Sequence, residues 1–241
     1  MKIRGQRECK ACGNLWSYYE TGSVSCPVCG SIESVGIDQE RSLHTATAAT
    51  LDLTPVRRRV DSEPLRRLAE TASNHAQEFT RGYGFIDNGR LRELDDTYLA
   101  AMELRSVASE LTRRMEPSPD EERYFVDLLH ADEGTRPDPE VVPRSMRAMR
   151  GLAYANACKE YRTDLRTYLN EHPDSTVTGT IGRLSSHIKR IRALQGGVEP
   201  NEAERLVSIA RTIGQYLSEG EEGALVRAEQ RLDALASALS E

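Results

Sequence analysis

The sequence predicts a small β domain over residues 1–38, a linker over residues 39–60 and an all-α helical bundle over residues 61–241. Two observations predict this division. Four of the five cysteines lie close to the N-terminus, among aromatic and β-branched residues. From about residue 61, apolar residues recur every three or four positions, which is the spacing of a buried helix face.

Composition limits the class of protein. The hydrophobic content of 38% is enough for a folded chain. No apolar stretch approaches the roughly 20 residues that span a bilayer, and the N-terminal "MKIRGQRECK" lacks the apolar core of a signal peptide. We therefore expect a cytoplasmic protein with no membrane partner. Thiols stay reduced there, so paired cysteines indicate a metal site rather than disulfides.

The N-terminal cysteines have the spacing C-x2-C-x13-C-x2-C, formed by Cys9, Cys12, Cys26 and Cys29. Gly13 and Gly30 follow the two pairs, and glycine tolerates the positive φ that a tight metal-binding turn often needs. Four thiolates complete a tetrahedral coordination sphere, so the site is expected to be structural. Zinc is the favoured ion, and iron is the alternative because it accepts the same four ligands.

The segment between the cysteine pairs predicts a β-hairpin. Residues 14–20 and 23–26 are rich in aromatic and β-branched side chains and flank a Gly-containing turn. A third short strand is predicted near residues 34–37. We expect three aromatic side chains of the hairpin, Trp16, Tyr18 and Tyr19, to be exposed and to contact a protein or nucleic acid partner.

Residues 5–38, with their two "CxxCG" sequences, resemble the zinc ribbon of transcription initiation factor IIB. This resemblance implies a zinc ion and an association with transcription. The helical part has no cyclin-type repeat, so the initiation-factor function does not carry over. The whole chain also resembles a haloarchaeal group of zinc-ribbon proteins, which implies no activity. Four lysines among 32 basic residues, with a net charge of -6, are in keeping with an archaeal, halophilic source.

The sequence "CPVCG" around the second pair also resembles a rubredoxin knuckle, which implies iron and one-electron transfer. A rubrerythrin-like di-iron bundle would need two Glu-x-x-His motifs. The nearest pattern here is a single Asp127-x-x-His130. A simple rubredoxin-like electron carrier therefore remains the alternative function.

Residues 39–60 are rich in Ser, Thr and Ala without an apolar period, and therefore predict a linker. Seven helices are predicted after it. Their approximate ranges are 61–79, 90–115, a short helix opened by a capping box at residues 118–121, 138–171, 174–195, one around 206–217 and one around 225–239.

The predicted bundle contains no recognisable catalytic group. It has no phosphate-binding loop, and its histidines are scattered. Cys158 and the tyrosines Tyr154, Tyr161 and Tyr168 share an apolar stripe and are expected to be core residues. We therefore expect no enzyme, although a site assembled only by folding remains a further alternative.

Residues 142–192 carry a net charge of +6 inside an acidic chain. Five of their basic residues form rows on two successive predicted helices and could bind an anion: Lys159, Arg162, Arg166, Arg183 and Arg190. Balancing the acidic helices nearby is the alternative role for these charges. The sequence thus favours a non-enzymatic zinc-ribbon adaptor that binds a protein or nucleic acid partner.

Overall fold

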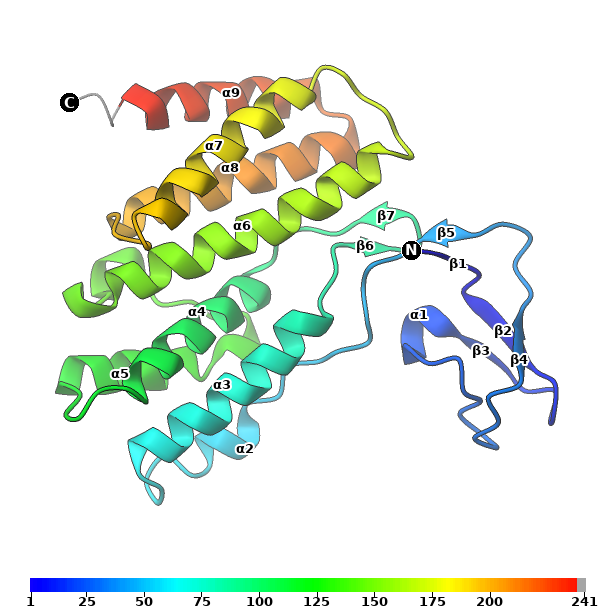
Figure 1. Ribbon diagram of the computed structural model, residues 1–241, viewed down its shortest axis with the longest axis horizontal. Coiled ribbons are helices and arrows are strands. Elements are labelled where there is room, and N and C mark those ends of the chain that lie inside the picture. The colour runs from blue at the N-terminus through cyan, green and yellow to red at the C-terminus, as the bar shows by residue number, and fades with distance from the viewer. Residues whose placement is uncertain (238–241) are drawn as a thin grey trace.

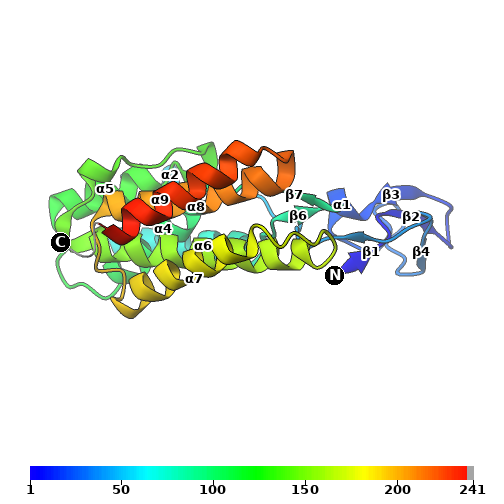
Figure 2. The same cartoon turned by 90° about the horizontal axis from the view of Figure 1, so that it is seen from above.

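The computed structural model describes residues 1–237, and it consists of a small β ribbon projecting from one end of a helical bundle (Figures 1 and 2). The ribbon is built on an antiparallel sheet in the order β3-β2-β4. Its strands are β2 (Gln6–Cys9), β3 (Leu15–Ser17) and β4 (Ser34–Gly36). The prediction of a small β part followed by helices is confirmed.

The strand pairing inside the ribbon differs from the predicted hairpin. Strand β3 pairs with β2, with Arg7 opposite Trp16, and residues 23–26 form no strand. The chain instead turns into the short helix α1 (Tyr18–Thr21), which ends at Gly22 with φ of 64°. The Tyr18 N–H donates to the Gly5 carbonyl at 2.7 Å, next to the Gln6–Ser17 pair, and the chain leaves the sheet after this bond. The third strand was predicted correctly.

The predicted linker is structured and contributes to both parts of the protein. Strand β5 (Ser42–Leu43) pairs with β1 (Lys2–Ile3) at the root of the ribbon. Further along, α2 (Thr54–Arg57) packs on the bundle, and both Leu53 and Val56 are fully buried in its core. Two apolar residues three positions apart are too few to reveal a helical period, and for this reason the sequence pattern missed the element.

The seven predicted helices are present. They are α3 (Leu65–Gly82), α4 (Asp96–Leu111), α5 (Pro119–Leu128), α6 (Arg147–Leu169), α7 (Thr178–Ala193), α8 (Pro200–Glu219) and α9 (Glu222–Ser237). The capping box between Ser118 and Glu121 opens α5 as predicted. Leu239, expected on the last apolar stripe, lies outside the described residues.

Two helix starts were wrong. The second helix, expected from residue 90, begins at Asp96, because residues 90–91 belong to the hairpin of β6 (Ile86–Asp87) and β7 (Arg90–Leu91), whose turn uses positive φ at Asn88 and Gly89. The long fourth helix begins at Arg147 rather than at residue 138, because residues 139–146 form two 3-10 turns around Pro143. Proline lacks the N–H that an α-helix would need at this position.

The bundle buries one continuous apolar core. Helix α4 packs between α3 and α6, α6 packs on α7 and α8, and α9 covers α8 (Figure 1). Cys158, Tyr154 and Tyr161 are buried in this core as expected, whereas Tyr168 is half-buried. Within the described residues, the helices are too polar or too short to span a membrane.

The ribbon is joined to the bundle by polar contacts around β5. The α-amino group of Met1 donates a hydrogen bond to the His44 carbonyl at 2.9 Å. The centroids of the Tyr19 and His44 rings lie 4.8 Å apart. One residue later, the Thr45 hydroxyl donates to Asp164 of α6 at 2.7 Å, and Asp164 also accepts from the Phe85 N–H at 2.7 Å. Asp164 thus holds both segments that lead away from the ribbon root.

A buried ion pair lies at the centre of the bundle. Glu103 of α4 and Arg150 of α6 are both 0% exposed, with Arg150 Nε 3.3 Å from Glu103 Oε1. The hydroxyl of Tyr154 donates to Glu103 Oε2 at 3.0 Å, and Tyr124 donates to Oε1. Burial raises the pKa of Glu103, an effect that Arg150 and the two hydroxyls only partly oppose. Removing either charge should therefore be costly.

We expect Arg150→Met to lower the free energy of unfolding by about 3–5 kcal/mol, because it leaves Glu103 buried without a counter-charge. Adding Glu103→Gln to the same chain should recover part of this loss, since the amide needs no counter-charge. Urea unfolding followed by far-UV circular dichroism measures both changes. If the double variant is less stable than Arg150→Met alone, the uncompensated carboxylate is not the cause.

Candidate metal centre

The two cysteine loops of the ribbon have the same backbone hydrogen bonds. In the first, the Gly13 N–H donates to the Cys9 carbonyl at 2.9 Å, and the Cys9 N–H donates to Asn14 at 2.9 Å. In the second, Gly30 donates to Cys26 and Cys26 donates to Ser31, again at 2.9 Å. Gly13 and Gly30 have φ of 73° and 72°, so the predicted need for positive φ is confirmed.

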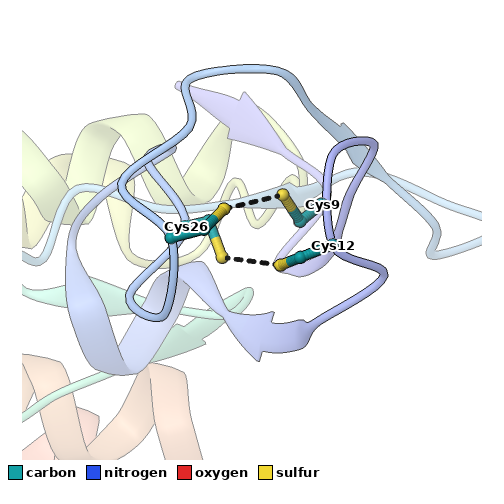
Figure 3. A group of neighbouring side chains, drawn as sticks. Cys9, Cys12 and Cys26 are labelled. Atoms are coloured by element: carbon teal, nitrogen blue, oxygen red, sulfur yellow. Dashed lines mark hydrogen bonds between the residues drawn. The ribbon is translucent and has the colours of Figure 1, made fainter.

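The loops bring the four predicted cysteine sulfurs together. Figure 3 shows Cys9 and Cys12 on one loop facing Cys26 across the site. Cys9 Sγ lies 3.6 Å from Cys29 Sγ, Cys12 Sγ lies 3.7 Å from Cys26 Sγ, and all four sulfurs lie within 4.8 Å of one another. A tetrahedral zinc ion with bonds of about 2.3 Å places its sulfurs about 3.8 Å apart. The geometry therefore fits a metal ion.

The thiols also show why this cluster needs a cation. The Cys12 N–H lowers the pKa of Cys9. Burial works against ionisation of Cys26, but the N–H groups of Cys29 and Val28 outweigh it and lower the pKa of Cys26 to about 6. The Asn14 N–H favours the Cys12 thiolate, yet the neighbouring sulfurs raise the pKa of Cys12 to about 12. Without a cation, the four thiols cannot all ionise at neutral pH.

Trp16 does not occupy the exposed position that the sequence analysis expected. It is 7% exposed and forms a small core with Cys9 and Cys26. Its indole Nε1–H donates to the Ser23 carbonyl at 3.1 Å. The hydrophobic ring packs behind the cysteine loops because the ribbon has few other side chains to bury. Trp16 is therefore a core residue of the metal centre.

Tyr18 and Tyr19 are half-buried on the side of the ribbon that faces the bundle. Both rings contact His44, and the Tyr19 hydroxyl donates to the Ile3 carbonyl at 3.4 Å. Tyr19 also lies against Gly5, where an added Cβ would come within 1.9 Å of the ring. These contacts use both tyrosines in the ribbon root, so they leave less surface for a partner than the sequence analysis expected.

The five basic residues proposed to bind anions lie on neighbouring helices, α6 and α7, and most of them have partners within the protein. Lys159 lies 2.8 Å from Glu160, Arg183 lies 2.5 Å from Asp233, and Arg190 contacts Glu202. Arg162 donates to Ser185 across the two helices, and Arg166 is exposed. These pairs favour charge balance as the role of the row, and anion binding at these residues stays a prediction.

The ribbon also carries an apolar surface that the sequence pattern did not reveal. Glu8 of β2 lies opposite both Leu15 of β3 and Val35 of β4, so these side chains share one face of the sheet. Leu15 is 61% exposed, Val35 is 37% exposed, and Ile37, two residues after Val35, is 47% exposed. We call Leu15, Val35 and Ile37 the apolar ribbon face. Val24, Val28 and Ile32 are also exposed on the ribbon.

The apolar ribbon face could have been found from the strand pairing but not from composition. The predicted hairpin pairs residues 14–20 with 23–26, whereas β3 pairs with β2, which in turn pairs with β4. The true order β3-β2-β4 brings Leu15 and Val35 to either side of Glu8.

Comparison with known proteins identifies one family whose model matches the chain. Residues 1–232 match DUF7117, a family of unknown function. No curated protein and no solved structure matches the chain. The match spans both the cysteine ribbon and the helices.

We expect Cys12→Ser to release the metal and unfold the ribbon, because metal binding worth about 10–16 kcal/mol replaces the core that so small a fold lacks. Most of the helical circular dichroism signal should remain, since the bundle has its own core. Lys10→Ser, an exposed change in the same loop, is the matched control. An equal loss of helical signal in Cys12→Ser would show that the bundle depends on the ribbon.

Proposed function

We propose that this chain, which belongs to the DUF7117 family of unknown function, is a non-enzymatic zinc-ribbon adaptor that binds a protein partner. The four cysteine sulfurs supply a full tetrahedral set of ligands, which leaves no position for a substrate. The ion then stabilises the ribbon, and the surface of the ribbon carries the function.

The apolar ribbon face is the observation that carries this proposal. Among the described residues, most of the large apolar side chains that are exposed to solvent lie on the ribbon. Exposed apolar residues gathered on one face are typical of protein interaction sites. A ribbon of this size can bury only a small surface area against a partner, and such an area is typical of a weak or transient complex rather than a permanent one.

A protein partner fits this surface better than nucleic acid. Phosphate contacts need free Lys or Arg side chains, whereas the centre of the apolar ribbon face is Glu8. Three of the five residues predicted to bind anions already lie beside carboxylates. The resemblance of the cysteine loops to transcription ribbons makes a protein of the transcription machinery the first partner to test.

An iron-containing electron carrier is the second candidate, and the exposure of two ligands favours it. Cys12 and Cys29 are exposed while Cys9 and Cys26 are buried, so one side of the metal centre is open to an electron-transfer partner. Tetrathiolate sites accept iron as well as zinc. The identity of the ion separates the two candidates.

Metal analysis of the native protein should find one zinc ion per chain and a colourless preparation, because Zn²⁺ has a filled d shell. Iron, visible absorption and a reversible one-electron reduction would instead establish the electron carrier. Purification from the organism that encodes the chain, rather than from an overproducing host, prevents metal substitution during expression.

Replacing the apolar ribbon face should abolish partner binding without releasing the metal. We expect Leu15→Gln/Val35→Thr to lose partner proteins that wild-type protein retains in affinity purification from the native organism. Both positions are exposed, so stability should change by no more than about 0.5 kcal/mol. Leu194→Gln/Val226→Thr changes two similarly exposed residues of the bundle and is the matched control.

The captured proteins should survive nuclease treatment and should bind purified wild-type chain directly. Equal capture by the ribbon variant and the control would reject the apolar ribbon face as the docking site. Capture that disappears with nuclease would favour nucleic acid as the partner.

A further inference from the structure

A polar cavity of about 380 Å³ lies between α8, α9 and the loop that follows β7. This volume is in the lower range of small-molecule sites, which are about 300–1,000 Å³. The cavity belongs to the helical part and is separate from the cysteine loops, which lie at the far end of the ribbon (Figure 2). The proposed adaptor function does not use it.

Three arginines from three different segments line the cavity. Arg92 comes from the loop after β7, Arg211 from α8 and Arg231 from α9. Within residues 1–237, neither Arg92 nor Arg231 has a carboxylate within ion-pair distance: Arg92 lies over the Tyr83 ring at 5.0 Å, and Arg231 Nη1 donates only to hydroxyls. These two positive charges are therefore available to a ligand.

Arg211 is fixed by its contacts but still has donors toward the cavity. Its Nε donates to the Leu94 carbonyl at 2.6 Å and its Nη2 donates to Asp96 at 2.6 Å. A guanidinium group carries five N–H donors, and these two contacts use only part of them. Arg211 is thus held in place by the α4 end of the loop. Because its side chain is already ordered, ligand binding should cost little of its conformational entropy.

The hydroxyl groups of Ser208 and Tyr161 can add donors, whereas the Thr212 hydroxyl already donates to the Ser208 carbonyl at 2.7 Å. Arg231 Nη1 lies 2.9 Å from Ser208 Oγ and 2.6 Å from Thr212 Oγ1, so both hydroxyls adjoin a guanidinium group. Tyr161 of α6 reaches the cavity past Gly214 of α8, where an added Cβ would come within 1.8 Å of the tyrosine hydroxyl. Glycine inside a helix costs about 1 kcal/mol, and here it provides the space for that hydroxyl.

The arrangement of these groups selects the class of ligand. Two carboxylates, Glu93 and Glu219, also line the cavity, and Arg211 pairs with Glu93 at 3.7 Å, so the positive excess comes from Arg92 and Arg231. Donors that approach from three segments suit a tetrahedral oxyanion, which accepts hydrogen bonds in several directions, better than a planar carboxylate. We propose that this cavity binds a small molecule through a phosphate group held by Arg92, Arg211 and Arg231.

Isothermal titration calorimetry of the full metal-loaded chain with inorganic phosphate tests the proposal. Ionic strength is held constant with chloride, and acetate is titrated as the planar anion. We expect saturable binding of one phosphate per chain, tighter than any binding of acetate. Arg92→Gln and Arg231→Gln should each weaken phosphate binding about tenfold or more, the effect of losing one charge-assisted hydrogen bond.

Arg205→Gln is the matched control, because Arg205 is an exposed residue of α8 outside the cavity lining. Its phosphate affinity should equal that of the wild type. Arg92 lies on an exposed loop, so its variant tests the site even if Arg231→Gln disturbs α9; circular dichroism checks both. Absence of saturable phosphate binding, equal affinity for acetate, or unchanged affinity in Arg92→Gln would overturn the proposal.

Discussion

The ribbon depends on four sulfur atoms being held within 4.8 Å of one another. Four thiols at such distances resist full ionisation, and the raised pKa of Cys12 expresses this resistance. A divalent cation reverses the balance by binding each thiolate directly. The remainder of the ribbon core is Trp16 packed against two of the cysteines, so apolar burial contributes little. The metal therefore replaces a hydrophobic core instead of adding to one.

The helical part is organised on a different physical basis. Its helices bury one large apolar cluster, and the Glu103–Arg150 pair lies inside it without exposure to solvent. Such a pair contributes little net stability, but it disfavours any packing of α4 and α6 that separates the two charges. The ribbon is thus held by coordination and the bundle by packing, and polar contacts around His44 and Asp164 connect the two.

The sequence predicted the features that depend on local chemistry. The cysteine spacing and the following glycines gave the metal-binding loops, because ligand geometry and positive φ are encoded within a few residues. Helical periodicity gave the seven long helices for the same reason. The buried position of Trp16 could not be predicted, since it depends on β3 pairing with β2 across the first cysteine loop. The pairing of Arg183 with Asp233 and of Arg190 with Glu202 depends on which helices are neighbours, which periodicity does not specify.

Asp164 of α6 accepts hydrogen bonds from the Thr45 hydroxyl, just after β5, and from the Phe85 N–H, just before β6, so one carboxylate joins the segment that leaves the ribbon to the β6–β7 hairpin. The backbone of the same segment is also bonded to the hairpin, because the Thr45 N–H donates to the Ile86 carbonyl at 2.9 Å. A connection held by both a side chain and the backbone resists rotation. The ribbon should therefore keep a fixed orientation relative to the bundle, with its outer surface at a constant distance from the helices. A partner that contacts both the ribbon and the bundle would have to match this distance in its own dimensions as well as match the chemistry of the two surfaces.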